Sequence, residues 1–96
     1  MSKPVRIAPG ARDDIREGEA YFDGKRAGLG DEFSDEVLGI LDRIQHMPEM
    51  YGEVEDGAPT RRFGYVVYYR VHAAESEVLA VLHGSRIAGP HLRRGP

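Results

Sequence analysis

The spacing of apolar residues changes once along this chain, from a helical period to a period of two, and this change limits the possible folds. From Ala11 to His46, apolar residues recur every three or four positions, as in an amphipathic helix. From Thr60 to His83 they form short runs rich in Val and Tyr, which favour strands. A chain of 96 residues has room for one hydrophobic core. Helices from the first half must therefore pack on a sheet formed by the second half.

The first half of the chain predicts two helices. The first starts at Ala11, and its Gly18 is expected to weaken it by about 1 kcal/mol relative to alanine. Residues 23–28, which include two glycines, interrupt it. The second helix is predicted over residues 29–46, and Pro48 stops it. Its apolar stripe consists of Leu29, Phe33, Val37, Ile40, Leu41 and Ile44. Because the connecting turn is short, we expect the two helices to form an antiparallel hairpin.

The strands are predicted on both sides of this hairpin. Val5–Ile7 alternates apolar and polar residues and forms a first strand. Residues 50–59 are polar and predict a loop. Three further strands are predicted as an antiparallel meander: Thr60–Phe63, Tyr65–His72 and Glu77–His83. The expected fold is α+β, with an N-terminal strand, an antiparallel helical hairpin and a three-stranded antiparallel meander.

One domain is expected over residues 1–86, followed by a loose C-terminal tail at residues 87–96. The strand segments 65–71 and 78–82 are apolar on both faces. One face should meet the helices. The other needs cover from the tail, from a partner protein or from a second copy of the chain.

The composition excludes several classes of site. Cysteine is absent, which rules out disulfides, thiolate zinc sites and a cysteine nucleophile. No apolar stretch is long enough to cross a membrane and no signal peptide is visible, so a cytoplasmic protein is expected. Residues 1–56 carry 7 Lys and Arg against 14 Asp and Glu, whereas residues 57–96 carry 6 Arg against 2 Glu. This asymmetry predicts one positive face.

Four segments stand out along the chain: IAPGARDDI at 7–15, MPEM at 47–50, RRFGYVVYYRV at 61–71 and VLAVLHGSR at 78–86. In this order they resemble the RelE/ParE superfamily of bacterial toxins. A resemblance to this superfamily implies a toxin of a type II toxin–antitoxin system, encoded beside an antitoxin whose C-terminal segment wraps around the toxin. It also implies the α+β fold expected above.

The two branches of the superfamily differ in their targets. RelE-like members cleave messenger RNA on the ribosome with basic residues on the middle strands, an arginine after a Gly-Tyr step and an arginine near the end of the last strand. Val66 follows Gly64-Tyr65 here, so one of these arginines is missing. Its loss should slow RNA cleavage by orders of magnitude. The similarity therefore favours the ParE branch, which inhibits DNA gyrase by protein–protein contact and needs neither an enzymatic activity nor a cofactor.

Two alternatives stay open at this point. The first is a ribosome-dependent endoribonuclease that uses Arg61, Arg62, His83 and Arg86. The second is a toxin fold that has lost its toxicity and serves as a binding or regulatory module. A homodimer is also compatible with the apolar second face of the sheet.

Five residues are expected to contact the target or the antitoxin: Arg62, Tyr68, Arg70, His83 and Arg86. The three arginines converge on one surface in this hypothesis, and such a surface suits phosphates or carboxylates. In the alternative, Arg70 only pairs with Glu77 across a hairpin, which contributes little. His83 is expected to play a structural role more readily than a proton-transfer role.

No metal site is expected, because the histidines lack the spacing of metal ligands. The first helix is also rich in carboxylates, which we assign to its solvated face rather than to catalysis. They are Asp13, Asp14, Glu17 and Glu19.

Overall fold

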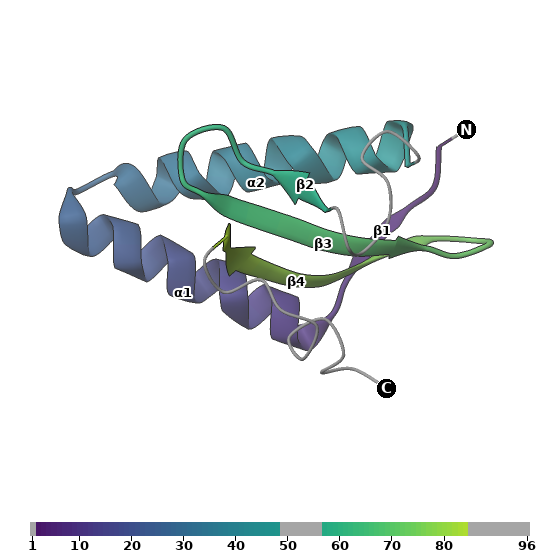
Figure 1. The fold of residues 1–96 in the computed structure, drawn as a ribbon, viewed down its shortest axis with the longest axis horizontal. Coiled ribbons are helices and arrows are strands. Elements are labelled where there is room, and N and C mark those ends of the chain that lie inside the picture. The colour runs from purple at the N-terminus through teal and green to yellow at the C-terminus, as the bar shows by residue number, and fades with distance from the viewer. Residues whose placement is uncertain (1, 49–56, 85–96) are drawn as a thin grey trace.

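Six elements follow one another along the chain in a computed structural model that describes residues 2–48 and 57–84. The elements are β1 (Val5–Ile7), α1 (Pro9–Lys25), α2 (Leu29–His46), β2 (Ala58–Pro59), β3 (Tyr65–Val71) and β4 (Ser76–His83). The two helices run antiparallel and lie against one face of the sheet (Figure 1). The helical hairpin predicted from the sequence is confirmed, and α2 has the predicted bounds.

The four strands form one sheet in the order β1-β4-β3-β2. Strands β2, β3 and β4 pair antiparallel, which confirms the predicted meander and the α+β class. Strand β1 pairs parallel with β4, with Val5 opposite Ser76. The first strand of the chain therefore lies beside the last one, and the helical hairpin connects β1 to the meander.

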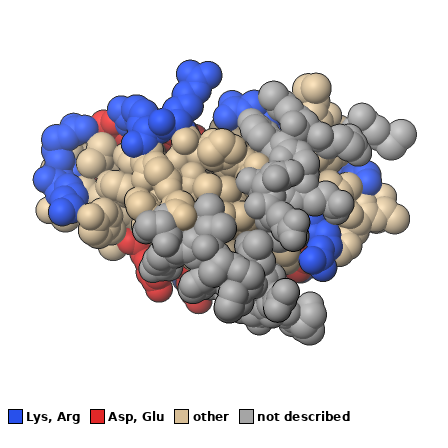
Figure 2. Space-filling view, in the orientation of Figure 1, with Lys and Arg blue, Asp and Glu red and all other residues tan. Residues whose placement is uncertain are grey.

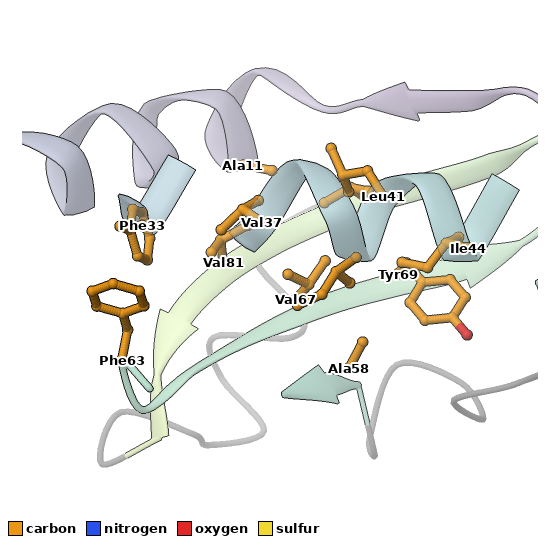
Figure 3. Close-up of a cluster of buried hydrophobic side chains, with 12 residues drawn as sticks. Ala11, Phe33, Val37, Leu41, Ile44, Ala58, Phe63, Val67, Tyr69 and Val81 are labelled. Atoms are coloured by element: carbon orange, nitrogen blue, oxygen red, sulfur yellow. The ribbon is translucent and has the colours of Figure 1, made fainter. Parts of the chain in front are cut away.

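The main core lies between the helices and the sheet (Figure 3). Helix α2 supplies the largest share of it, because most of its predicted stripe is buried there. Strands β3 and β4 contribute Val67, Tyr69, Val78 and Val81 from the facing side. The hydroxyl of Tyr69 donates a hydrogen bond of 2.8 Å to the carbonyl oxygen of Pro48, which ties the end of α2 to the sheet.

The prediction of a strand at Thr60–Phe63 is wrong, because the strand lies earlier, at Ala58–Pro59, within the predicted loop. The Thr60 hydroxyl donates to the carbonyl oxygen of Tyr65 at 3.0 Å and accepts from the amide of Tyr65 at 3.1 Å. These bonds close a loop whose Phe63 turns into the core. Most of the predicted loop, residues 50–56, lies outside the described residues.

Helix α1 is longer than its periodicity predicts. It begins at Pro9, which is favourable in the first turn because proline has no amide hydrogen to leave unpaired. It continues through Gly24 to Lys25, inside the segment predicted to interrupt it.

Gly18 has a different role from the one expected, because α1 and α2 approach each other closely there. A Cβ atom at this position would lie 2.6 Å from Cε2 of Phe33, a side chain that is fully buried. The absence of a side chain at Gly18 therefore stabilises the helix pair, although it weakens the isolated helix.

A second, smaller apolar cluster consists of Tyr68, Ala80 and Leu82, all almost fully buried, with Val66 packed against it. It lies on the sheet face opposite the helices, because successive side chains of a strand point to opposite faces. The expectation that this face is covered by the tail, a partner or a second copy stays a prediction. None of the helices within residues 2–48 and 57–84 is long and apolar enough to span a bilayer.

We predict opposite effects for two glycine-to-alanine changes in α1. Gly18→Ala should destabilise the protein by about 1–3 kcal/mol, since its methyl group must displace the buried ring of Phe33. Gly24→Ala is the matched control, because nothing lies within 4 Å of the added atom, and it should stabilise by about 0.5–1 kcal/mol. Urea unfolding of both variants measures the difference. Equal effects of the two changes would contradict the proposed close approach.

Candidate functional site

The described arginines and the histidine among the predicted contact and catalytic residues lie toward the two ends of strand β3. Arg61 and Arg62 precede it in the loop after β2, and His83 lies opposite Tyr65 at the same end. Arg70 lies five residues further along the strand, a separation of about 16 Å at the usual rise per residue. The structure therefore places the first three residues at one end of the sheet and Arg70 toward the other. Arg86 lies outside the described residues.

The loop before β3 is held against α2 by two glutamates of that helix. Nη2 of Arg62 lies 2.6 Å from Oε1 of Glu32, and its guanidinium carbon lies 4.9 Å from the ring centroid of Phe63. Glu32 also pairs with Arg26 at 3.6 Å. The backbone amide of Arg61 donates a hydrogen bond to the carboxylate of Glu36. Arg62 thus has a structural partner, while its side chain is still more than half exposed.

This ion pair changes the titration of Glu32. The hydrogen bond from Arg62 lowers the pKa of the Glu32 carboxyl below 4.5, and the charges of Arg26 and Arg62 act in the same direction. The folded protein therefore binds a proton at Glu32 less readily than the unfolded chain does.

The imidazole of His83 packs edge-on against the ring of Tyr65, with 5.5 Å between the ring centroids. Its Nε2 also lies close to Gly64, where an added Cβ atom would be only 3.3 Å away. These contacts favour the structural role expected for His83. They also fix the position of the β4 end beside residues 60–64, which we call the arginine loop because it carries Arg61 and Arg62.

Arg70 is exposed and does not pair with Glu77, although the two residues are opposite each other in the sheet. The carboxylate of Glu77 instead meets His72 at 3.0 Å and Arg6 at 3.3 Å. The hydrogen bond from His72, followed by the charge of Arg6, lowers the pKa of Glu77. Within the described part of the chain, no ion pair is recorded for Arg70, so its guanidinium is available to a partner.

Tyr68 is fully buried, so its side chain offers no surface to a partner in this structure. Its hydroxyl finds no hydrogen-bond partner among residues 2–48 and 57–84. Burial raises the pKa of this hydroxyl.

The assignment of all four α1 carboxylates to the solvated face is wrong for Asp14, whose side chain is almost fully buried. Its Oδ2 accepts a hydrogen bond of 3.0 Å from the backbone amide of Val81. Strand β1 covers the outer edge of β4 only up to Val78. Beyond this point the Asp14 carboxylate, and not a strand carbonyl, accepts the hydrogen bond from the β4 backbone. A signal was present in the sequence, because Ala11, Asp14 and Gly18 share one helical face by their spacing.

The charges are unevenly distributed over the surface. On the face that Figure 2 shows, Lys and Arg gather along the margin where the helical hairpin turns and on the side of α2, while Asp and Glu emerge mainly on the side of α1. Within the ranges that the structure describes, no three His, Asp or Glu side chains gather as a metal site would require.

The family model described as "ParE toxin of type II toxin-antitoxin system, parDE" matches residues 5–88. The chain belongs to the ParE toxin family. The match spans all six elements, and it confirms the resemblance found in the sequence. It places the chain among the toxins of type II toxin–antitoxin systems.

A solved structure agrees with this fold. The chain is similar to a protein of the "Chromosomal ParDE TA system from P. aeruginosa", with a TM-score of 0.72 and 10% sequence identity. The alignment covers 85% of this chain and 96% of the other. At this identity the likeness supports the ParE fold and not a particular target. No curated protein sequence matches the chain.

We predict that Asp14→Ala destabilises the ParE domain by about 1–3 kcal/mol, because the buried amide of Val81 loses its acceptor. Asp14→Asn should cost less, since its amide oxygen can still accept. Asp13→Ala is the control on the exposed face of the same helix and should stay within about 0.5 kcal/mol of the parent. Chemical denaturation gives the energies, and hydrogen exchange at the Val81 amide reports the local effect. Slow exchange of this amide in Asp14→Ala would argue against its dependence on the carboxylate.

The Glu32 ion pair predicts a pH dependence of stability. Because the folded pKa of Glu32 is lowered, its contribution is present above pH 4.5 and is lost as the pH falls through the folded value. Arg62→Gln should move the pKa of Glu32 upward, whereas Arg70→Gln should leave it unchanged. Carboxyl carbon chemical shifts followed by NMR from pH 2 to 7 measure both values. An unchanged Glu32 titration in Arg62→Gln would show that the ion pair does not persist in solution.

Proposed function

We propose that this protein is the toxin of a type II toxin–antitoxin pair, that it inhibits DNA gyrase by protein–protein contact, and that a cognate antitoxin encoded beside it neutralises it. The observation that carries the proposal is the ParE family match across residues 5–88. The proposed site of action is the cytoplasm, where the target and the antitoxin would both be encountered.

The geometry around β3 argues against the alternative of RNA cleavage. Such a reaction needs charged groups that converge on a phosphate and stabilise its pentacoordinate transition state. Position 66 carries a valine, which offers no charge. The guanidinium of Arg62 is drawn toward Glu32 on α2. Within the described residues, the expected catalytic cations are thus not preassembled around one phosphate position.

A protein target would meet charged side chains at both ends of β3. Exposed arginines are effective at protein interfaces because each combines several hydrogen-bond donors with a flat, weakly hydrated group. We assign contact with gyrase or the antitoxin to Arg62, Arg70, His83 and Arg86. Arg70 is exposed, whereas Tyr68 is fully buried in the second apolar cluster, so we assign Tyr68 to the packing of its sheet face rather than to the exposed contacts.

The test is pulse-labelling of cells directly after induction of the protein, with thymidine for DNA synthesis and with methionine for protein synthesis. We expect DNA synthesis to collapse first and DNA damage to follow, since gyrase inhibition stops replication. Supercoiling by purified gyrase should also fall when the purified protein is added. A first collapse of protein synthesis, together with cleaved messenger RNA, would replace this proposal by the endoribonuclease.

The His83→Ala variant sharpens this test, because an inhibitor that acts by contact needs no proton transfer. It should still collapse DNA synthesis, with at most a several-fold loss of potency, because it loses one of several proposed contacts and the packing against Tyr65. A folded His83→Ala protein without any toxicity would contradict inhibition by contact without proton transfer. A parent protein that is folded and never toxic would favour the third reading, a binding or regulatory module.

A further inference from the structure

Glu32, in the first turn of α2, lies between two arginines that come from other parts of the chain. Its Oε2 is 3.6 Å from Nη2 of Arg26, at the turn between the helices, and its Oε1 is 2.6 Å from Nη2 of Arg62, in the arginine loop. Both oxygens of one carboxylate therefore face a guanidinium. Paired arginines hold the acidic group of a ligand in the same way, and here the acidic group belongs to the protein itself.

The two arginines are fixed at their backbones and accessible at their side chains. The amide of Arg26 donates to the carbonyl oxygen of Phe22 at 3.1 Å, and its own carbonyl oxygen accepts from the amide of Leu29 at 3.0 Å. The loop that carries Arg62 is anchored in the core by Phe63. The side chains of Arg26 and Arg62 are nevertheless 62% and 57% exposed. A ligand can therefore reach both guanidinium groups without any change in the backbone.

Arg61 supplies a third positive charge in the same loop. Its backbone amide is bound to the carboxylate of Glu36, but its exposed guanidinium forms no ion pair with any residue in the ranges 2–48 and 57–84. Lys and Arg also gather along the neighbouring margin where the helical hairpin turns (Figure 2). The arginine loop therefore attracts acidic groups, and Glu32 already occupies one of its two arginines.

We propose that the arginine loop binds an acidic segment of a protein partner, and that Glu32 is an internal competitor which this segment replaces at Arg62. An exposed ion pair contributes little net free energy, so the competitor lowers the affinity for the partner without blocking it. A nucleic-acid backbone fits less well, because Glu36 and the exposed Asp31 and Asp35 of the same helix repel a row of phosphates. Only the identity of the partner, antitoxin or gyrase, rests on the proposed function.

The test uses the full chain and two probes of nearly the same shape, the acetylated dipeptide amides of glutamate and of glutamine. NMR titration at low salt should show saturable shifts of the Nε–H signals of Arg61 and Arg62 with the acidic dipeptide. The neutral dipeptide should bind several-fold more weakly, because it lacks the charges. Equal binding of the two would overturn the proposal. Neither probe requires toxicity or gyrase, so failure here and failure of the proposed function are distinguishable.

Glu32→Gln isolates the competition, because its side chain keeps its length and loses its charge. It should tighten binding of the acidic dipeptide about threefold to fivefold, the range expected for release of an exposed ion pair. Asp31→Asn is the matched control, since it removes an equal charge from the same first turn of α2, and Asp31 has no ion pair within the described part of the chain. Equal gains in the two variants would show a general effect of net charge and overturn the proposal.

A double variant locates the competition. In an Arg62→Gln background, Glu32→Gln should give no gain, because the released guanidinium is absent. In an Arg16→Gln background the gain should persist, since this exposed arginine of α1 pairs with Asp13 instead. A gain that survives the loss of Arg62 would overturn the proposal.

A thymidine trinucleotide with the same number of negative charges tests the chemistry of the partner. Weaker binding of the trinucleotide than of the acidic dipeptide supports an acidic protein segment. Equal or tighter binding of the trinucleotide would overturn this assignment in favour of a nucleic acid.

Discussion

The ring of Phe33 occupies the space that Gly18 leaves open, and the arrangement of both layers depends on this contact. From there the ring reaches Phe63 in the loop before β3, at 5.4 Å, and Tyr65 at the start of β3, at 5.0 Å. One side chain of α2 therefore touches α1, the loop and the sheet. A larger residue at position 18 would push these parts away from each other, since buried rings have little room to move.

The surface features of the arginine loop follow from this packing. Because Phe63 is anchored in the core, its neighbours Arg61 and Arg62 come to lie over the outer side of α2, where Glu36 and Glu32 bind them. The ring of Phe63 thus attaches the loop to the core, while the Arg62–Glu32 ion pair and the hydrogen bond from the Arg61 amide to Glu36 attach it to α2. An exposed ion pair contributes little energy, so the ring is the stronger attachment and the ion pair orients Arg62. Such oriented, exposed side chains suit recognition of a protein surface.

Asp14 completes the edge of the sheet beyond the end of β1. Where β1 ends and the chain turns into α1, strand β4 loses its neighbour, and the amide of Val81 would remain buried without an acceptor. The carboxylate of Asp14 satisfies this amide, because a buried donor without a partner is costly.

The sequence by itself determined the elements whose burial repeats regularly: the apolar stripe and bounds of α2, and strands β3 and β4 to within a residue or two. It also determined the family, because four segments in order carry the resemblance. Only the tertiary structure decided that β1 pairs with β4, that β2 precedes Thr60, and that Arg70 lies far from Arg62. The roles of Gly18 and Asp14 were likewise decided there. The physical reason is that a periodic pattern reports the burial of one element, whereas strand partners, close approaches and buried hydrogen bonds depend on residues far away in the chain.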